Sequence, residues 1–366
     1  MFSEYYARLP IQEKMDECRS VTASEVETVL NQSSWSVEDM PVLLSIAAQD
    51  FLEPMAQLSH SITQQRFGNT IKMFAPLYLS NECYNRCTYC GYSMDLDIKR
   101  VTLTEQQALM DAQKLKEKGF THILLLTGEA PDKAGVDYLE KMIKLLKPFF
   151  SSIGLEVYPH KQAEYERLIQ AGADGLTLYQ ETYHQPTYEA IHISGKKRNY
   201  KLRMDAPDGG GKAGFHRINV GALLGLYDWR YDSIALAYHV QYLNKHYWQS
   251  KLGISVPRIQ KFAGTFKSEY PVTDKDLVQF MCAFRLVFPD IGIALSTREK
   301  AVLRDQLIPL GVTDMSAESK TGPGGYTGLD SGDQFDISDE RPLETVLDVI
   351  RSKGYEPMLK DWDRVI

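Results

Sequence analysis

The chain has 366 residues, 43% of them hydrophobic and 24% charged, and its formal net charge at pH 7 is -7. A chain this acidic has no overall basic field, which disfavours nucleic acid or an anionic membrane as its partner. No stretch approaches 18 apolar residues, which excludes a membrane-spanning helix. The first residues resemble neither a secretory signal nor a transit peptide, so we expect a cytoplasmic protein.

Residues 1–68 are predicted to form an N-terminal helical extension. Thr22 stands three residues before Glu25, and Ser36 stands three residues before Asp39. This spacing is typical of capping boxes, and apolar residues at helical spacing follow each pair. Nothing in the segment suggests chemistry, so we expect it to pack on the rest of the protein.

After residue 68, short apolar runs alternate with amphipathic stretches about eight times. This alternation predicts a parallel sheet, and eight units favour a closed (β/α)8 barrel of the TIM type, with a doubly wound open sheet as the alternative. We place the barrel at residues 69–330 and a C-terminal helical tail at 331–366. In either fold, chemistry gathers at the carboxyl ends of the strands. The expected strands are 73–80, 122–128, 153–159, 174–180, 217–225, 255–260, 291–297 and 312–318.

Three of the five cysteines follow the first expected strand, as Cys83, Cys87 and Cys90 with the spacing C-x3-C-x2-C. In the reducing cytosol, clustered cysteines indicate metal ligands or catalysts. A closed zinc site takes four ligands, and no second cysteine pair exists. Three thiolates can instead hold a 4Fe-4S cluster and leave its fourth iron open, although a zinc site completed by a distant His or Asp is the alternative. Cys18 and Cys282 are isolated in apolar surroundings and are expected to be buried hydrophobes.

The cysteine motif, with Tyr89 one place before Cys90, resembles the signature of the radical S-adenosylmethionine (SAM) superfamily. The resemblance implies that the open iron binds the amino and carboxylate groups of SAM. It also implies that an electron from the cluster cleaves SAM to methionine and a 5'-deoxyadenosyl radical. Tyr89 is thereby expected beside the bound cofactors.

Later strand ends carry further resemblances to this superfamily. Thr127, Gly128 and Glu129 in "LLLTGEA" are similar to the segment that holds the SAM amino group, with Thr in place of a Gly; a capped strand-to-helix turn is the alternative. Glu181 stands where related enzymes place an acidic ribose ligand. Arg203 matches a basic residue that pairs with the SAM carboxylate, although an arginine on a solvated helix face has the same pattern.

The segments "RFGNTIKMFAPLYLSNECYNRCTYCGYSM", "LLLTGE", "YQETYH", "HYWQS", "CAFRL", "LSTRE", "SAESKTGPGGY" and "KDWD" together resemble the 2-iminoacetate synthase family. These enzymes are the tyrosine lyases of thiamine thiazole biosynthesis. The resemblance implies cleavage of the Cα–Cβ bond of L-tyrosine to 4-cresol and 2-iminoacetate, with methionine and 5'-deoxyadenosine as coproducts. It also implies thiazole synthase as a partner and flavodoxin or ferredoxin as the electron donor.

Three alternatives to this function stay open or are disfavoured. A tryptophan lyase of related architecture is hard to exclude from motifs, and a zinc-stapled barrel without enzymatic activity is the competing class. The sister tyrosine lyase of hydrogenase maturation carries a second cluster on an added C-terminal domain. No cysteine follows Cys282, which disfavours that relative.

Substrate contacts are expected at the last strands. A bidentate Arg suits a carboxylate better than Lys does, and Arg298 in "LSTRE" is our candidate for the substrate carboxylate, with pairing to Glu299 as the alternative. Ser296 lies beside Arg298, and Tyr92 follows the last cluster ligand, where the family has a pocket aromatic. Ser316 is a further pocket candidate.

Three further residues and two glycine-rich stretches are weaker candidates for parts of the site. Ser319 and Thr297 flank the same strand ends, and His239 is a possible base that is more simply read as a packed helix residue. The glycine-rich stretches 205–214 and 321–328 lack phosphate-loop spacing and are expected to be loops on the open face of the barrel.

Overall fold

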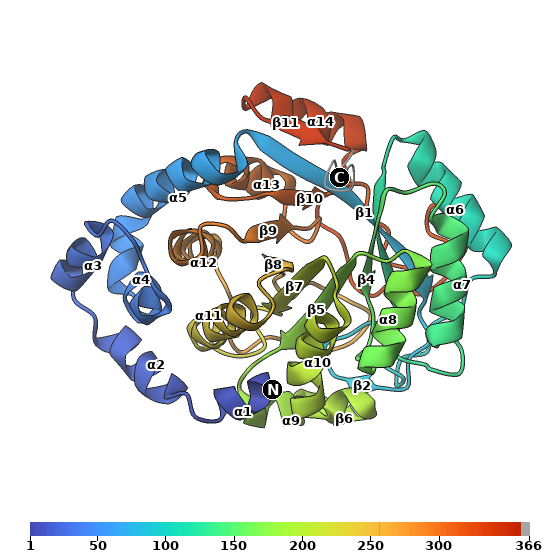
Figure 1. Cartoon of the computed structure of the whole chain (residues 1–366), viewed down its shortest axis with the longest axis horizontal. Helices are drawn as coiled ribbons and strands as arrows, with labels where there is room; N and C mark the ends of the chain where they lie inside the picture. Colours follow the sequence, from blue (N-terminus) through green and yellow to red (C-terminus); the bar gives the residue numbers. More distant parts are fainter. Residues whose placement is uncertain (256, 360–366) are drawn as a thin grey trace.

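The computed structural model describes residues 1–255 and 257–359, and its centre is a closed barrel of eight parallel strands (Figure 1). The barrel closes because β10 pairs with both β9 and β1. The predicted (β/α)8 barrel is therefore confirmed, and the open sheet is wrong. The strands, in their order around the barrel, are β1 Thr70–Ser80, β3 His122–Thr127, β4 Ser152–Glu156, β5 Gly175–Glu181, β7 Arg217–Ala222, β8 Lys251–Ser255, β9 Gly292–Leu295 and β10 Asp314–Ser316.

Helices join successive strands and lie outside the barrel (Figure 1). Their apolar faces pack on the outward side chains of the strands, and the two sets form one continuous hydrophobic core. Within the described residues, no helix is long and apolar enough to cross a membrane. The helices are α6 Glu105–Glu117, α7 Val136–Leu146, α8 Gln162–Ala171, α9 Gln185–Ile191, α10 Tyr200–Ala213, α11 Trp229–His246, α12 Asp274–Val287 and α13 Ala301–Leu307, with the 3-10 turns η3 Lys196–Arg198 and η4 Ile308–Leu310.

The N-terminal helices wrap around one side of the barrel, over α11 and α12 (Figure 1). Both predicted capping boxes are present: the Glu25 amide donates to Thr22 Oγ1 at 3.4 Å, and the Ser36 amide donates to Asp39 Oδ2 at 2.7 Å. These elements are α1 Phe2–Tyr6, α2 Ile11–Ser20, α3 Ala23–Leu30, η1 Val37–Asp39, α4 Met40–Leu43, η2 Ala47–Phe51 and α5 Leu52–Phe67.

The segment after residue 330 first crosses the barrel mouth and then returns to the opposite end. Residues 332–338 bond to the loops that follow β1, β8, β9 and β10. The chain then forms α14 (Leu343–Ser352) and a short strand, β11 (Glu356–Met358), which pairs with the start of β1. The predicted helical tail thus contains a strand as well, and the motif "KDWD" (360–363) lies outside the described residues. The domain boundaries at 68 and 330 stay a prediction.

The sixth strand was predicted at 255–260, but β8 ends where that prediction begins. Residues 251–255 carry a weak apolar signal because Gly253 occupies the middle of the strand. A Cβ at Gly253 would lie 2.9 Å from Asn219 Oδ1, so a larger residue would displace the Asn219 side chain. Of the predicted span, Val256 lies outside the described residues, and Arg258 forms only an isolated bridge with Leu224.

The glycine-rich stretch 205–214 was predicted to be a loop on the open face, and this is wrong, because residues 205–213 are in α10. Close packing explains the glycines. A Cβ on Gly210 would lie 2.4 Å from Leu176 Cδ2, and one on Gly211 would lie 2.4 Å from the Tyr247 ring. The helix therefore forms against its low propensity because of what it packs on. The second stretch, 321–328, contains turns and no helix or strand, as predicted.

Candidate active site at the barrel mouth

The three clustered cysteines lie in the loop after β1, at the carboxyl ends of the barrel strands. This loop contains the two-residue strand β2 (Arg86–Cys87), which pairs with β6 (His192–Ser194). The pairing brings the segment between β5 and α10 over the cysteines. Cys18 and Cys282 are buried elsewhere in the hydrophobic core, as predicted.

The sulfur atoms of this loop already receive N–H donors. Cys83 Sγ accepts from Asn85 Nδ2 at 3.6 Å, and Cys90 Sγ accepts from the amide of Tyr92 at 3.4 Å. Such donors to ligand sulfur are among the features that tune iron–sulfur clusters. Burial raises the pKa of the Cys87 and Cys90 thiols, so their thiolates need a nearby positive charge or a metal.

This donor set fits a cluster better than a single metal ion. All three thiols are free of disulfides and come from one loop. Across residues 1–255 and 257–359, no three Cys, His, Asp or Glu side chains converge as ligands of one ion. Three ligands from one loop suit three corners of a 4Fe-4S cube, whereas a closed zinc site takes four.

The end of β3 lies against the cysteine loop. A Cβ on Gly128 would lie 2.3 Å from the carbonyl oxygen of Glu82 and 3.0 Å from Cys83 Cβ, so only glycine allows this approach. Glu129 Oε2 accepts from Asn85 Nδ2 at 2.7 Å. Thr127 Oγ1 is buried without a hydrogen-bond partner among the described residues, which leaves a polar group for a ligand.

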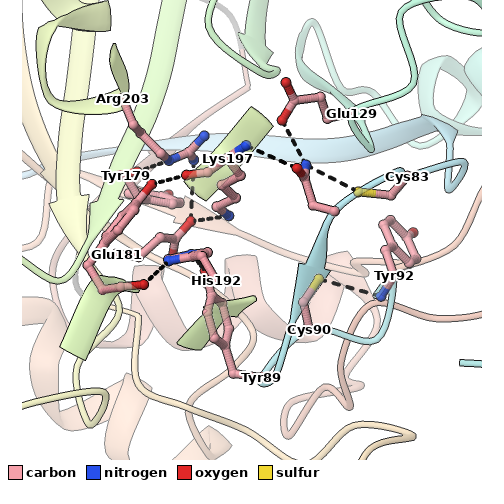
Figure 2. A network of polar contacts seen from close by, with 12 residues as sticks. Cys83, Tyr89, Cys90, Tyr92, Glu129, Tyr179, Glu181, His192, Lys197 and Arg203 are labelled. Carbon is pink, nitrogen blue, oxygen red and sulfur yellow. Dashed lines mark hydrogen bonds and ion pairs between the residues drawn. The ribbon is translucent and has the colours of Figure 1, made fainter. Parts of the chain in front are cut away.

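A buried ion cluster lies on the other side of the cysteine loop (Figure 2). Glu181 Oε1 lies 2.7 Å from Lys197 Nζ and 3.3 Å from Arg203 Nη2, and Arg203 Nε also donates to the Tyr179 carbonyl at 2.7 Å. Burial alone would raise the pKa of Glu181, but the two cations outweigh it and lower that pKa. Arg203 is thus no solvated surface residue.

Backbone strain also marks Glu181. Its φ is +74°, a left-handed conformation that costs a non-glycine residue energy. The backbone is held there because its carbonyl accepts from the Leu223 amide at 2.8 Å. This conformation places the carboxylate between the two cations.

Tyr89 is buried and reaches the same cluster (Figure 2). Its hydroxyl donates to His192 Nε2 at 2.8 Å, because His192 Nδ1 is occupied in donating to the Tyr188 carbonyl at 2.7 Å. Lys197 Nζ lies 5.6 Å from the centre of the Tyr89 ring. The aromatic residue of the cysteine motif is therefore fixed between the thiols and the ion cluster.

A cavity inside the barrel mouth collects the predicted substrate residues. Ser296, Arg298, Ser316 and Ser319 line it, together with Glu156 and other residues of β1, β5 and the loop after β10. Within the described residues Arg298 has no ion pair, and its guanidinium lies 3.3 Å from the centre of the Phe335 ring. Glu299 instead pairs with Arg258, whose Nε lies 3.0 Å from Glu299 Oε1, so the alternative pairing for Arg298 is wrong.

Two other aromatic or basic candidates lie outside this cavity lining. Tyr92 packs edge-on against Tyr78, which does line the cavity, and its hydroxyl donates to the Thr321 carbonyl. His239 is buried in α11, where it bonds to the Tyr183 hydroxyl at 2.8 Å and stacks on Phe2. His239 is therefore a packed helix residue and no base for the substrate.

Four residues of the site were not predicted from the sequence. Asn85 and Lys197 stand among ordinary polar residues, and only the tertiary structure reveals that they are buried together. His192 is likewise hidden in a short strand. Glu156 did leave a signal, because it is a carboxylate inside the apolar run 153–159.

Comparisons with known proteins agree with this geometry. Residues 77–237 match the radical SAM superfamily, and residues 255–356 match the biotin and thiamin synthesis associated domain. The chain is 43% identical to the 2-iminoacetate synthase of Escherichia coli over 364 residues, covering 99% of this chain and 97% of that protein. The chain belongs to the 2-iminoacetate synthase family. The 2-iminoacetate synthase of Salmonella typhimurium is 44% identical over 93% of this chain and 91% of its own length.

Solved structures place this 2-iminoacetate synthase family member among radical SAM barrels. A crystal structure of HydG, a maturase of the [FeFe]-hydrogenase, superposes with a TM-score of 0.90 at 31% identity, over 96% of this chain and 79% of HydG. HydG from Carboxydothermus hydrogenoformans gives 0.91 at 30% identity, over 99% and 86%. Methylornithine synthase (PylB), at 20% identity and a TM-score of 0.72, shares the fold. The family and superfamily predicted from the sequence are confirmed, and they imply a 4Fe-4S cluster and SAM.

Proposed function

We propose that this enzyme cleaves the Cα–Cβ bond of L-tyrosine to 2-iminoacetate and 4-cresol, and converts SAM to methionine and 5'-deoxyadenosine. The observation that carries the proposal is the cavity that contains Arg298, a cation without an ion pair among the described residues, and that shares its wall with the cysteine loop. Tyr78 and Leu126 line this cavity and belong to the cluster on which Cys83 and Cys90 pack. Near-complete coverage of two curated 2-iminoacetate synthases supports the same reaction.

The cofactor contacts are part of the proposal. Cys83, Cys87 and Cys90 would bind three irons of the 4Fe-4S cluster. When bound, the cluster and SAM supply a hydrogen-abstracting 5'-deoxyadenosyl radical. The remaining cofactor-binding candidates are Tyr89, Thr127, Gly128, Glu129, Glu181 and Arg203.

The chain's own groups suit the three parts of SAM. Thr127 Oγ1, Gly128 and Glu129 offer acceptors for its ammonium beside Cys83. Arg203 offers a cation for its carboxylate, and Glu181 offers acceptors for ribose hydroxyls. Glu181 and Arg203 lie 3.3 Å apart, and Arg203 helps to keep Glu181 ionised.

Arg298 would hold the substrate carboxylate, with Ser296 and Ser316 as hydrogen-bonding neighbours in the cavity. Ser316 Oγ accepts from the Thr297 amide at 3.2 Å, which fixes its position. Tyr92 would support the cavity wall through Tyr78. The same cavity would exclude water from the reaction and from the imine product, which hydrolyses readily.

Two protein partners and a cytoplasmic location complete the proposal. A thiazole synthase would consume the imine, and flavodoxin or ferredoxin would supply electrons. The match to the biotin and thiamin synthesis associated domain supports a place in thiamine synthesis.

The test is anaerobic turnover of reconstituted protein with SAM and dithionite, in parallel tubes with L-tyrosine and L-tryptophan. We expect 4-cresol and 5'-deoxyadenosine from tyrosine only, and neither from variants with Cys83, Cys87 or Cys90 changed to Ala. Formation of 5'-deoxyadenosine without 4-cresol would overturn the proposal that L-tyrosine is the substrate. If protein shown to hold a cluster formed neither product, the proposal that it is a radical SAM enzyme would be overturned.

A further inference from the structure

Glu156 occupies a position that the proposed cofactor and substrate contacts leave unassigned. It is the last residue of β4, and β4 lies between β3 and β5 in the barrel. Its register partner on β3 is Leu126, directly before Thr127 and Gly128. Glu156 therefore stands between the two strand ends that carry the proposed SAM contacts.

The carboxylate of Glu156 faces the same cavity as Arg298. Gly154 and Glu156 point inward in β4, whereas Ile153 and Leu155 point into the outer hydrophobic core. Glu156 makes no hydrogen bond or ion pair with any residue of 1–255 or 257–359. A half-buried carboxylate without a partner is costly unless a ligand supplies one.

The charges around Glu156 define what that ligand group should be. Four charged groups act on its carboxylate: Arg298 on the substrate side, and Glu181, Arg203 and Lys197 on the cofactor side. An amino acid held through its carboxylate by Arg298 carries its ammonium group one carbon away from that carboxylate. The ammonium would then lie in the cavity that Arg298 and Glu156 both line.

We propose that Glu156 binds the α-ammonium group of the substrate and accepts a proton from it, leaving the neutral amine. In this step one N–H bond breaks and one O–H bond forms, the carboxylate becomes a carboxylic acid, and no oxidant or reductant takes part. The neutral amine keeps two N–H bonds, either of which would be available to the hydrogen-abstracting chemistry that the bound cofactors would supply. This inference rests on the proposed function for the identity of the substrate.

The acidity of Glu156 suits this exchange. Burial raises its pKa to about 7, even though Arg298 opposes the shift. A carboxyl group with this pKa is partly ionised near neutral pH and can both accept and hold a proton. The titratable and charged groups that face it are Arg298, Glu181, Arg203, Lys197, Tyr78 and Tyr179.

The test compares binding of three ligands to cluster-loaded protein with SAM, kept oxidised so that no turnover occurs. L-tyrosine has all the groups in question, L-phenylalanine lacks the phenol, and 3-(4-hydroxyphenyl)propionate lacks the amine. We expect Glu156→Gln to weaken both amino acids by about 10- to 100-fold, the usual worth of a charged hydrogen bond, and to leave the propionate unchanged. Glu166→Gln on α8, which removes one charge outside the cavity, should change none of them.

Two outcomes would overturn the proposal. Equal weakening of all three ligands, or of none, would show that Glu156 does not bind the amine. Weakening of tyrosine and the propionate without phenylalanine would assign Glu156 to the phenol.

Unaltered protein gives a check that does not depend on the variant folding. Its preference for tyrosine over the propionate should fall as pH drops from about 8 to about 6, because protonation neutralises Glu156. A pH-independent preference would overturn the proposal.

Failure of the proposed function can be distinguished from failure of this inference. Every α-amino acid carries the same ammonium group, so a protein that cleaves tryptophan instead would show the same dependence on Glu156 with tryptophan and its desamino acid.

Discussion

Gly128→Ala should damage cluster binding without removing a thiol. The new Cβ would lie 2.3 Å from the carbonyl oxygen of Glu82, and contacts under 3.0 Å essentially never occur for a real Cβ. The gap to that limit is 3.0 − 2.3 Å, so β3 or the cysteine loop must shift by at least about 0.7 Å. The clash is with backbone, so no side chain can rotate away. The residue next to Glu82 is Cys83, and a shift there moves its thiol.

Overpacking of this kind costs about 1–3 kcal/mol, which lowers the Tm of a chain of this size by about 1–4 °C. The assay is the iron and sulfide content per chain after anaerobic reconstitution, with Tm measured on the same samples. Gly209→Ala is the matched control, because its Cβ would have its nearest neighbour, the Tyr165 ring, at 3.5 Å in the middle of α10. It should keep full iron content and gain about 0.5–1 kcal/mol of stability. Full iron content and an unchanged Tm in Gly128→Ala would refute the reasoning.

Three further predictions concern charges. Arg298→Ala should raise KM for the amino acid by about 10- to 100-fold in steady-state cresol formation. Arg298→Lys should raise it less, because Lys keeps the charge but loses the bidentate geometry. A KM equal to that of the unaltered protein in both variants would argue against the contact. Asp339→Asn leaves the fully buried Arg304 without its ion pair and should cost about 3–5 kcal/mol in urea unfolding. Arg304→Met should cost less, because Asp339 also pairs with Arg341 at 2.8 Å, and the reverse order would contradict this account. The two neighbouring cations lower the pKa of Glu181 in the folded protein. Its ionised form therefore stabilises the fold above the unfolded pKa of about 4.3, and this stability is lost as the pH falls below that value. Glu181→Gln should flatten the fall of Tm between about pH 5 and pH 3.

The barrel and the cysteine site were predictable because their signals are local. The eight-fold alternation, the capping boxes at Thr22 and Ser36, and the C-x3-C-x2-C spacing are each visible within a short window. Position after a strand then places residues such as Glu129 and Glu181 at the barrel mouth without any tertiary information.

What the sequence did not reveal depends on packing between distant segments. The three glycines at 209–211 oppose a helix locally, and the helix exists because Leu176 and Tyr247 fill the space that side chains would need. Lys197 is a surface residue by composition, and its burial against Glu181 follows from the pairing of β2 with β6. Burial of a charge is a property of the assembled barrel, and no local pattern records it.

The segment that crosses the barrel mouth has a consequence for how the protein is made. The Gly91 amide donates to the Gln334 carbonyl at 3.0 Å, and Tyr78 donates to the Gln334 side chain at 2.8 Å. These contacts join the cysteine loop to residues that leave the ribosome more than two hundred positions later. The thiols are therefore synthesised long before this wall of their pocket exists. During that interval the cysteine loop lacks the hydrogen bonds that hold it in the finished enzyme, so the C-terminal segment can fix this loop only after the rest of the barrel has been made.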